Sequence, residues 1–74
     1  MPKFGVFSGA EVCKILERHG FALVRQRGSH AVMQGKTAEG GTVTVPVPLH
    51  REIRAGTLLS IIRQSGLPRQ NFEL

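Results

Sequence analysis

The sequence predicts a mixed α/β (α+β) domain with the element order helix, three strands, helix. The strands form an antiparallel sheet, and both helices lie on one face of this sheet. Two stretches repeat their apolar residues at helical spacing. Three stretches between them have the alternation or composition of strands. Short turn signals separate these strands, which favours antiparallel pairing. A chain of 74 residues is long enough for one domain, which we assign to residues 1–74.

The first predicted helix runs from about Gly9 to His19. Ser8 and Glu11 have the spacing of a capping box, in which each side chain accepts a hydrogen bond from the backbone of the other residue. Gly20 supplies the stop, because glycine takes the left-handed cap conformation without strain. The apolar stripe of this helix consists of Val12, Ile15 and Leu16.

Three strands are expected before the second helix. Gly28 and Ser29 form a tight turn between the first two, and the polar loop 35–41 leads to the third. Pro46 has no N–H to donate to a neighbouring strand, so the third strand is placed at a sheet edge. The expected strands are 21–27, 30–34 and 42–47. The residues expected to point inward from the third are Val43, Val45 and Val47.

The second predicted helix runs from Leu58 to Ser65. Thr57 is a suitable N-cap residue, and Gly66 ends the helix. A short final turn follows, from which Phe72 is expected to pack back on the core. The apolar stripe of this helix consists of Leu58, Ile61 and Ile62.

The composition is that of a folded protein with a basic surface. Apolar residues make up 41% of the chain, and ten Lys and Arg oppose five acidic residues, for a formal charge of +5. Seven of the ten are arginines, which grip phosphate through a planar fork. So small a domain has a thin core without room for a deep cavity. We therefore expect a large, acidic partner held on an open surface.

The single cysteine, Cys13, cannot form an internal disulfide, which fits a reducing cytoplasm. No apolar run has transmembrane length, and no signal-peptide pattern is present. Cys13 and the three histidines lack the paired short spacings of a zinc site. We expect a cytoplasmic protein that uses no metal and no small-molecule cofactor and makes no membrane contact.

The first hairpin brings a histidine and two arginines together. A two-residue turn at Gly28 and Ser29 pairs Arg27 with His30, and cross-strand partners share a sheet face. The sheet face that the two helices leave uncovered is the open face. Its expected occupants are Arg25, Arg27, His30 and Gln34. The expected occupants of the opposite face are Val24, Ala31 and Met33.

Such a cluster suits cleavage of RNA. RNA carries its own nucleophile, the 2′-hydroxyl. An enzyme therefore need only transfer protons and stabilise the negative charge on the reacting phosphate. Histidine has an ordinary pKa of about 6.5 and can serve as base or acid. Neighbouring arginines supply fixed positive charge to the phosphate.

Several sequence blocks, in this order, resemble those of the HicA-type mRNA interferase toxins of type II toxin–antitoxin systems. The blocks cover nearly the whole chain, and the ordered set is far more specific than any one of them. They are Ser8-Gly9, Gly20-Phe21, Arg25-Gln26-Arg27-Gly28-Ser29-His30, Val45-Pro46, His50 and Gly56-Thr57-Leu58.

The resemblance implies a fold like that of double-stranded-RNA-binding domains, ribosome-independent cleavage of mRNA, and neutralisation by a HicB-type antitoxin. It places the catalytic histidine of the family at His30. The connector from Pro46 to His50 is longer than the commoner Val-Pro-x-His form of the family, so no role is assigned to His50. Arg25, Arg27 and Ser29 are the candidates for RNA contact.

Plainer roles remain open for each candidate. Arg25 and Arg27 can be an ordinary solvated strand face, Ser29 only a turn former, and His50 a loop histidine. For the whole protein, the alternatives are a non-catalytic RNA-binding module and an inactive toxin homologue that only binds its antitoxin.

Overall fold

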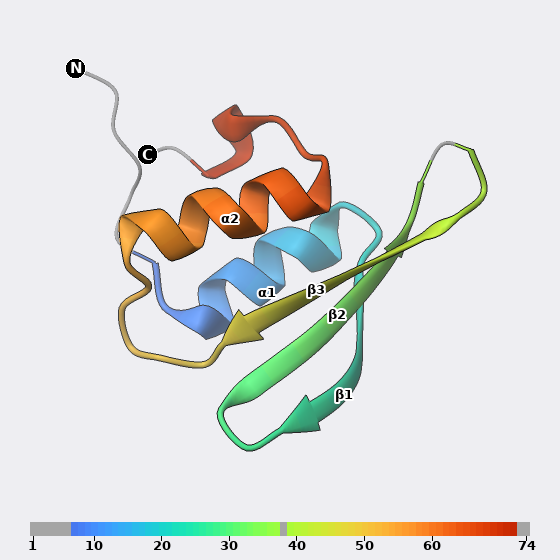
Figure 1. Ribbon diagram of the computed structural model, residues 1–74. Helices are drawn as coiled ribbons and strands as arrows, with labels where there is room; N and C mark the ends of the chain where they lie inside the picture. The colour runs from blue at the N-terminus through green and yellow to red at the C-terminus, as the bar shows by residue number, and fades with distance from the viewer. Residues whose placement is uncertain (1–6, 38, 73–74) are drawn as a thin grey trace.

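A computed structural model describes residues 7–37 and 39–72 (Figure 1). The outermost parts of the predicted domain, 1–6 and 73–74, lie outside these ranges. The order of helix, three antiparallel strands and helix confirms the predicted fold class. The elements are α1 (Gly9–Arg18), β1 (Ala22–Arg27), β2 (His30–Lys36), β3 (Thr42–Pro48), α2 (Ala55–Ser65) and a final 3₁₀ turn, η1 (Arg69–Phe72).

Both helices cover the same face of the sheet, as predicted (Figure 1). Their apolar stripes pack against residues that alternate along β2 and β3, while the intervening residues of these strands point to the other face. The sheet order is β1-β2-β3, so β3 is an edge strand, as Pro46 requires. The core consists of Val12, Leu16, Phe21, Met33, Val45, Val47, Ile53, Leu58, Ile61, Ile62 and Phe72.

The capping box of α1 is present as predicted. The Glu11 N–H donates to Ser8 Oγ over 3.1 Å, and the Ser8 N–H donates to Glu11 Oε1 over 2.8 Å. These bonds satisfy two N–H groups that have no partner within the helix. The helix ends at Arg18 with His19 as its C-cap, followed by Gly20 at a φ of 91°. This end lies within one residue of the predicted one.

The β1–β2 hairpin has the predicted register, with Arg27 paired to His30 and Arg25 to Val32. Gly28 takes a φ of 57°, which supplies the positive φ that a two-residue hairpin turn needs. A β-bulge between Leu23 and Arg25 breaks the alternation of β1. The placement of Val24 on the covered face is therefore wrong.

Val24 is instead 53% exposed. It borders a shallow hollow together with Ala22 and Gln34, whereas Leu23 pairs with Met33 toward the helices. The bulge inserts one extra residue, so each side chain before it changes face relative to a regular strand.

Strand β2 continues two residues further than predicted, through Gly35 and Lys36. Gly35 pairs with Val43 and is covered by the ring of Phe21; a Cβ there would lie 2.9 Å from Phe21 Cγ. The glycine is therefore needed for close packing within a strand, and it does not belong to the loop. Strand β3 likewise extends one residue past its predicted end, to Pro48.

Helix α2 begins at Ala55, three residues before its predicted start. Its N-cap is Arg54, which makes no side-chain capping hydrogen bond. Thr57 is thus the third residue of the helix, and its prediction as N-cap is wrong. Gly66, with a φ of 74°, ends the helix as predicted.

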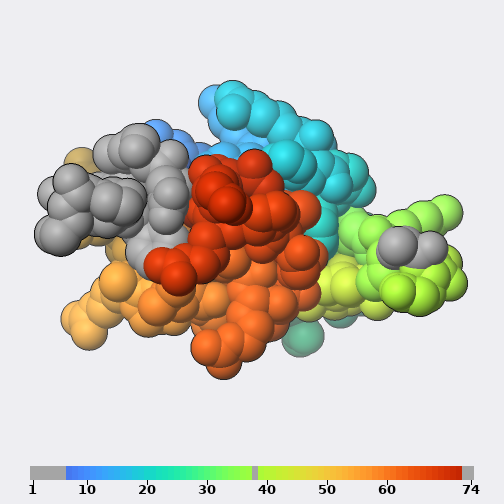
Figure 2. Space-filling model, turned by 90° about the horizontal axis from the view of Figure 1, so that it is seen from above, coloured from blue at the N-terminus to red at the C-terminus, as the bar shows by residue number. Residues whose placement is uncertain are grey.

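The C-terminal turn closes the core from the side opposite the sheet. Figure 2 shows η1, in red, between α1 and α2. Phe72 at its end is fully buried, as predicted. In the described part of the chain, neither helix has the length and apolar character needed to cross a lipid bilayer.

Candidate active site

The open face of the sheet presents His30 at the centre of a row that crosses all three strands. Arg27 of β1 and Pro48 of β3 are its partners on either side. The next row consists of Arg25, Val32 and Pro46. His30 and both arginines are exposed, so the imidazole and the two guanidinium groups are accessible from the same side of the molecule.

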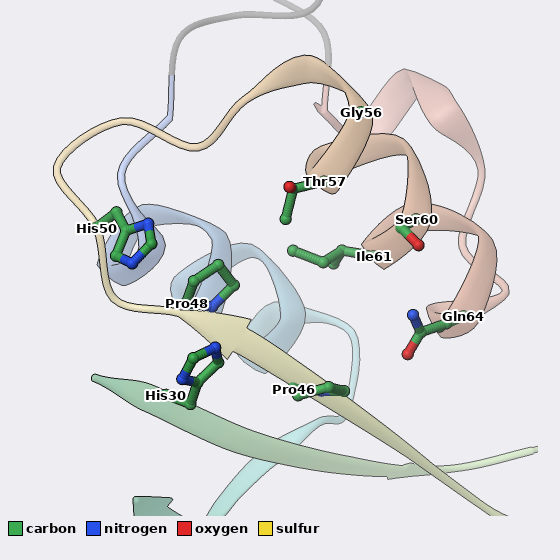
Figure 3. Close-up of a pocket in the computed structure, with 9 residues that line it drawn as sticks. All are labelled: His30, Pro46, Pro48, His50, Gly56, Thr57, Ser60, Ile61 and Gln64. Carbon is green, nitrogen blue, oxygen red and sulfur yellow. The ribbon is translucent and has the colours of Figure 1, made fainter. Parts of the chain in front are cut away.

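A hollow of about 480 Å³ begins at His30 and continues past the edge strand onto α2 (Figure 3). One wall is formed by the open-face residues of β2 and β3, and the other by the exposed side of α2. Ile61, from the buried stripe of α2, is also part of its lining. The lining residues are His30, Pro46, Pro48, His50, Gly56, Thr57, Ser60, Ile61 and Gln64.

The connector that carries His50 is fixed to two other parts of the fold. The Leu49 N–H donates to the Ser29 carbonyl over 2.6 Å, which joins the connector to the β1–β2 turn. The His50 carbonyl accepts a hydrogen bond of 2.9 Å from the Gly9 N–H, which joins it to the start of α1. The connector therefore holds His50 in place and is also bonded to the residue that precedes His30.

Gly9 allows this close approach. A Cβ at position 9 would overlap the Pro48 carbonyl oxygen and lie 2.7 Å from Leu49 Cα. Only glycine fits there without displacing the connector, so the first residue of α1 helps to set the position of His50.

The remaining polar candidates have structural surroundings. Gln34 Nε2 donates to Thr44 Oγ1 over 3.3 Å on the open face, away from the row that contains His30. Ser29 contributes its carbonyl to the bond with Leu49. His19 is exposed as the C-cap of α1 and does not line the hollow. Within residues 7–37 and 39–72, no three His, Cys, Asp or Glu side chains gather as metal ligands do.

Cys13 lies partly buried against the core on the helix side of the sheet. Burial raises the pKa of this thiol, and the nearby charge of Glu17 raises it further. Cys13 is therefore a poor nucleophile at neutral pH and is remote from the open face.

The comparison with known families decides the identity of the chain. The sequence model of the family described as the HicA toxin of bacterial toxin–antitoxin systems matches residues 9–67. The chain belongs to the HicA toxin family. It is thus the toxin of a toxin–antitoxin system, which pairs such a toxin with an antitoxin. A search of the curated proteins finds no match.

The region shared with the HicA family runs from the first residue of α1 to just beyond α2. It therefore includes the hairpin of His30, the connector of His50 and the helix wall of the hollow. The family resemblance seen in the sequence is confirmed by this match.

The α2 wall of this HicA toxin was not foreseen from the sequence. Thr57, Ser60 and Gln64 recur at spacings of three and four, which places polar groups along one side of α2. That periodicity was visible in the sequence. Its meaning was not, because it depends on how α2 lies beside β3.

Proposed function

We propose that this HicA toxin is a metal-independent endoribonuclease that cleaves mRNA in the cytoplasm, with residues 1–74 acting as one domain. His30 is its general acid/base. One observation carries the proposal: an exposed imidazole lies between an arginine-bearing strand and a hollow whose helix wall carries the polar side chains Thr57, Ser60 and Gln64. This position lets the imidazole reach a phosphodiester that lies across the open face.

The substrate is held by charge on one side and by polar groups on the other. Arg27 lies directly beside His30, and Arg25 lies one row further along the same face. We expect the two guanidinium groups to contact phosphates of a single RNA strand. The Ser29 hydroxyl lies at the turn that precedes His30 and is a further candidate for phosphate contact. Because these contacts are to the backbone, they bind RNA with little dependence on sequence.

Cleavage proceeds by transfer of the phosphoryl group within the RNA. The 2′-oxygen attacks the adjacent phosphorus as its proton leaves, and the bond from phosphorus to the 5′-oxygen breaks as that oxygen gains a proton. The products are a 2′,3′-cyclic phosphate and a free 5′-hydroxyl. Because the substrate supplies the nucleophile, no metal-bound water is needed. Proton transfer by one imidazole accelerates such a step by about 10²–10⁴-fold.

The antitoxin partner is proposed to be of the HicB type and to cover the open face. A surface with acidic residues would complement the +5 charge of the toxin and speed association. Covering His30 and its neighbouring arginines would block RNA and inhibit the toxin directly.

The test compares His30→Ala with His19→Ala, which removes an exposed histidine away from the hollow. Each purified protein is incubated with a long transcript in buffer containing EDTA. We expect the parent and His19→Ala to cleave, and His30→Ala to bind RNA with unchanged affinity but lose cleavage by at least about 100-fold.

Two results would contradict the proposal. If the parent binds RNA without cutting it, and His30→Ala retains the effect of the parent on growing cells, the protein is a non-catalytic RNA-binding module. If the parent neither binds nor cuts RNA but still binds its antitoxin, it is an inactive toxin homologue.

A further inference from the structure

We infer that His50 is a second catalytic residue, which shares the two proton transfers of RNA cleavage with His30. The inference rests on the proposed ribonuclease function and adds a residue to it. The observation behind it is that both imidazoles line the same hollow, on either side of Pro48 in Figure 3.

The backbone sets the spacing of the two histidines. His30 pairs with Pro48, and the bond between Leu49 N–H and the Ser29 carbonyl carries the contact of β2 with β3 beyond the end of the strand. His50 therefore lies two residues beyond the direct partner of His30. Pro48 lies between the two histidines, and both imidazoles line the same hollow (Figure 3). Two imidazoles in one open hollow can act on a single phosphodiester.

RNA cleavage moves two protons, one at each of two oxygens. The attacking 2′-oxygen and the departing 5′-oxygen lie roughly in line on opposite sides of the phosphorus. One imidazole takes the proton from the 2′-hydroxyl, and a second, protonated imidazole gives a proton to the 5′-oxygen. Protons, bonds and electrons balance within this step, because no oxidant, metal or other reactant takes part. A single histidine would have to reach both oxygens in turn.

The side chain of His50 is not required by the fold. It is exposed, and the hydrogen bond that holds this residue to α1 uses its backbone carbonyl, which any residue provides. Replacement of the imidazole should therefore leave the connector and the hollow intact. A loss of activity in such a variant reflects the imidazole itself.

The first experiment measures cleavage and binding separately for His50→Ala, His30→Ala and His19→Ala. Binding is measured with an RNA whose 2′-hydroxyls are methylated, so that it cannot be cut. We expect His50→Ala to bind like the parent and to cleave about 10²–10⁴-fold more slowly, while His19→Ala cleaves like the parent. Cleavage by His50→Ala within threefold of the parent would overturn the inference and leave the role of His30 untouched.

The second experiment identifies the proton donor. In an RNA with sulfur in place of the bridging 5′-oxygen at the cut site, the leaving group is a thiolate that departs without being protonated. The variant that lacks the acid should recover to within about tenfold of the parent on this substrate, while the variant that lacks the base stays slow. Recovery of one of the two variants supports the shared mechanism. Recovery of both, or of neither, contradicts it.

Failure of the proposed function has a different signature. If the parent protein cuts neither substrate, or if His30→Ala cuts both like the parent, the ribonuclease assignment itself is wrong. If only His50→Ala behaves like the parent, His30 acts without the help of His50.

Discussion

The contact between the start of α1 and the connector makes a strong prediction about Gly9→Ala. Alanine is ordinarily the better helix residue, so propensity alone predicts that this substitution stabilises the protein by up to about 1 kcal/mol. The added methyl group would instead overlap the Pro48 carbonyl oxygen and crowd Leu49 Cα at 2.7 Å. Both neighbours are backbone atoms and cannot turn aside as a flexible side chain would.

The size of the effect follows from two costs and one gain. Overpacking costs about 1–3 kcal/mol. Displacement of the connector also weakens the 2.9 Å bond from the Gly9 N–H to the His50 carbonyl, which contributes about 1 kcal/mol. After the gain in helix propensity, we expect a net loss of about 1–3 kcal/mol in the free energy of unfolding. For a domain of this size the fall in Tm is roughly 5–20 °C.

Gly56→Ala is the matched control, because it makes the same change in the first turn of the other helix. A Cβ at Gly56 meets no atom within 4 Å. This variant should therefore equal or exceed the stability of the parent. Urea and thermal unfolding followed by circular dichroism measure both. A Gly9→Ala protein as stable as Gly56→Ala would refute the assignment of Gly9 as a site of close backbone approach.

Three further predictions concern charge, core and thiol. Arg27→Ala should weaken the binding of single-stranded RNA and make the negative slope of log affinity against log salt concentration shallower by about 0.7. Arg18→Ala, on α1, should leave this slope unchanged in the same titration. Phe72→Ala removes a fully buried ring and should lower the free energy of unfolding in urea by about 3–5 kcal/mol; a loss below 1 kcal/mol would show that η1 adds little to the core. Cys13, whose pKa is raised by burial and by Glu17, should react with iodoacetamide more slowly in the folded protein than in urea. Because burial makes the pKa of the folded thiol higher than that of the unfolded one, the contribution of the neutral thiol to stability is complete below the unfolded pKa and is lost as the pH rises through the folded pKa. A Cys13→Ala variant should lack that part of the alkaline fall in stability.

Local signals in the sequence predicted most of the fold. The capping box of Ser8 and Glu11, the apolar stripes and the turn at Gly28 each depend on residues that lie close together in the chain. Pro46 placed β3 at the sheet edge because a missing N–H cannot be supplied elsewhere. The register of the first hairpin followed from its turn, and it put Arg27 beside His30.

Features that depend on contacts between distant segments were missed. The bulge in β1 reverses the faces of Leu23 and Val24, and nothing in those two apolar residues marks it. Gly35 reads as a loop residue until the ring of Phe21 is seen to lie over it. Thr57 has the side chain of a cap, but α2 starts earlier and places it in the wall of the hollow.

The site was foreseen only in part for the same reason. The hairpin half, with His30 and its two arginines, follows from strand pairing alone. The half formed by His50 and α2 depends on where the second helix lies beside the edge strand and on how the connector is anchored. Neither can be read from spacing along the chain.

The most direct test of the central claim, imidazole-catalysed attack by the 2′-hydroxyl, is a single substrate comparison. The purified toxin is given an RNA that it cuts, and the same RNA with one 2′-deoxynucleotide on the 5′ side of the cut bond, in buffer containing EDTA. Mass spectrometry of the product ends should find a 2′,3′-cyclic phosphate and a 5′-hydroxyl from the first RNA, and no cut at the substituted bond of the second. Cleavage of the deoxy-substituted bond, or products with a 5′-phosphate, would mean that water is the nucleophile and that the proposed role of His30 is wrong.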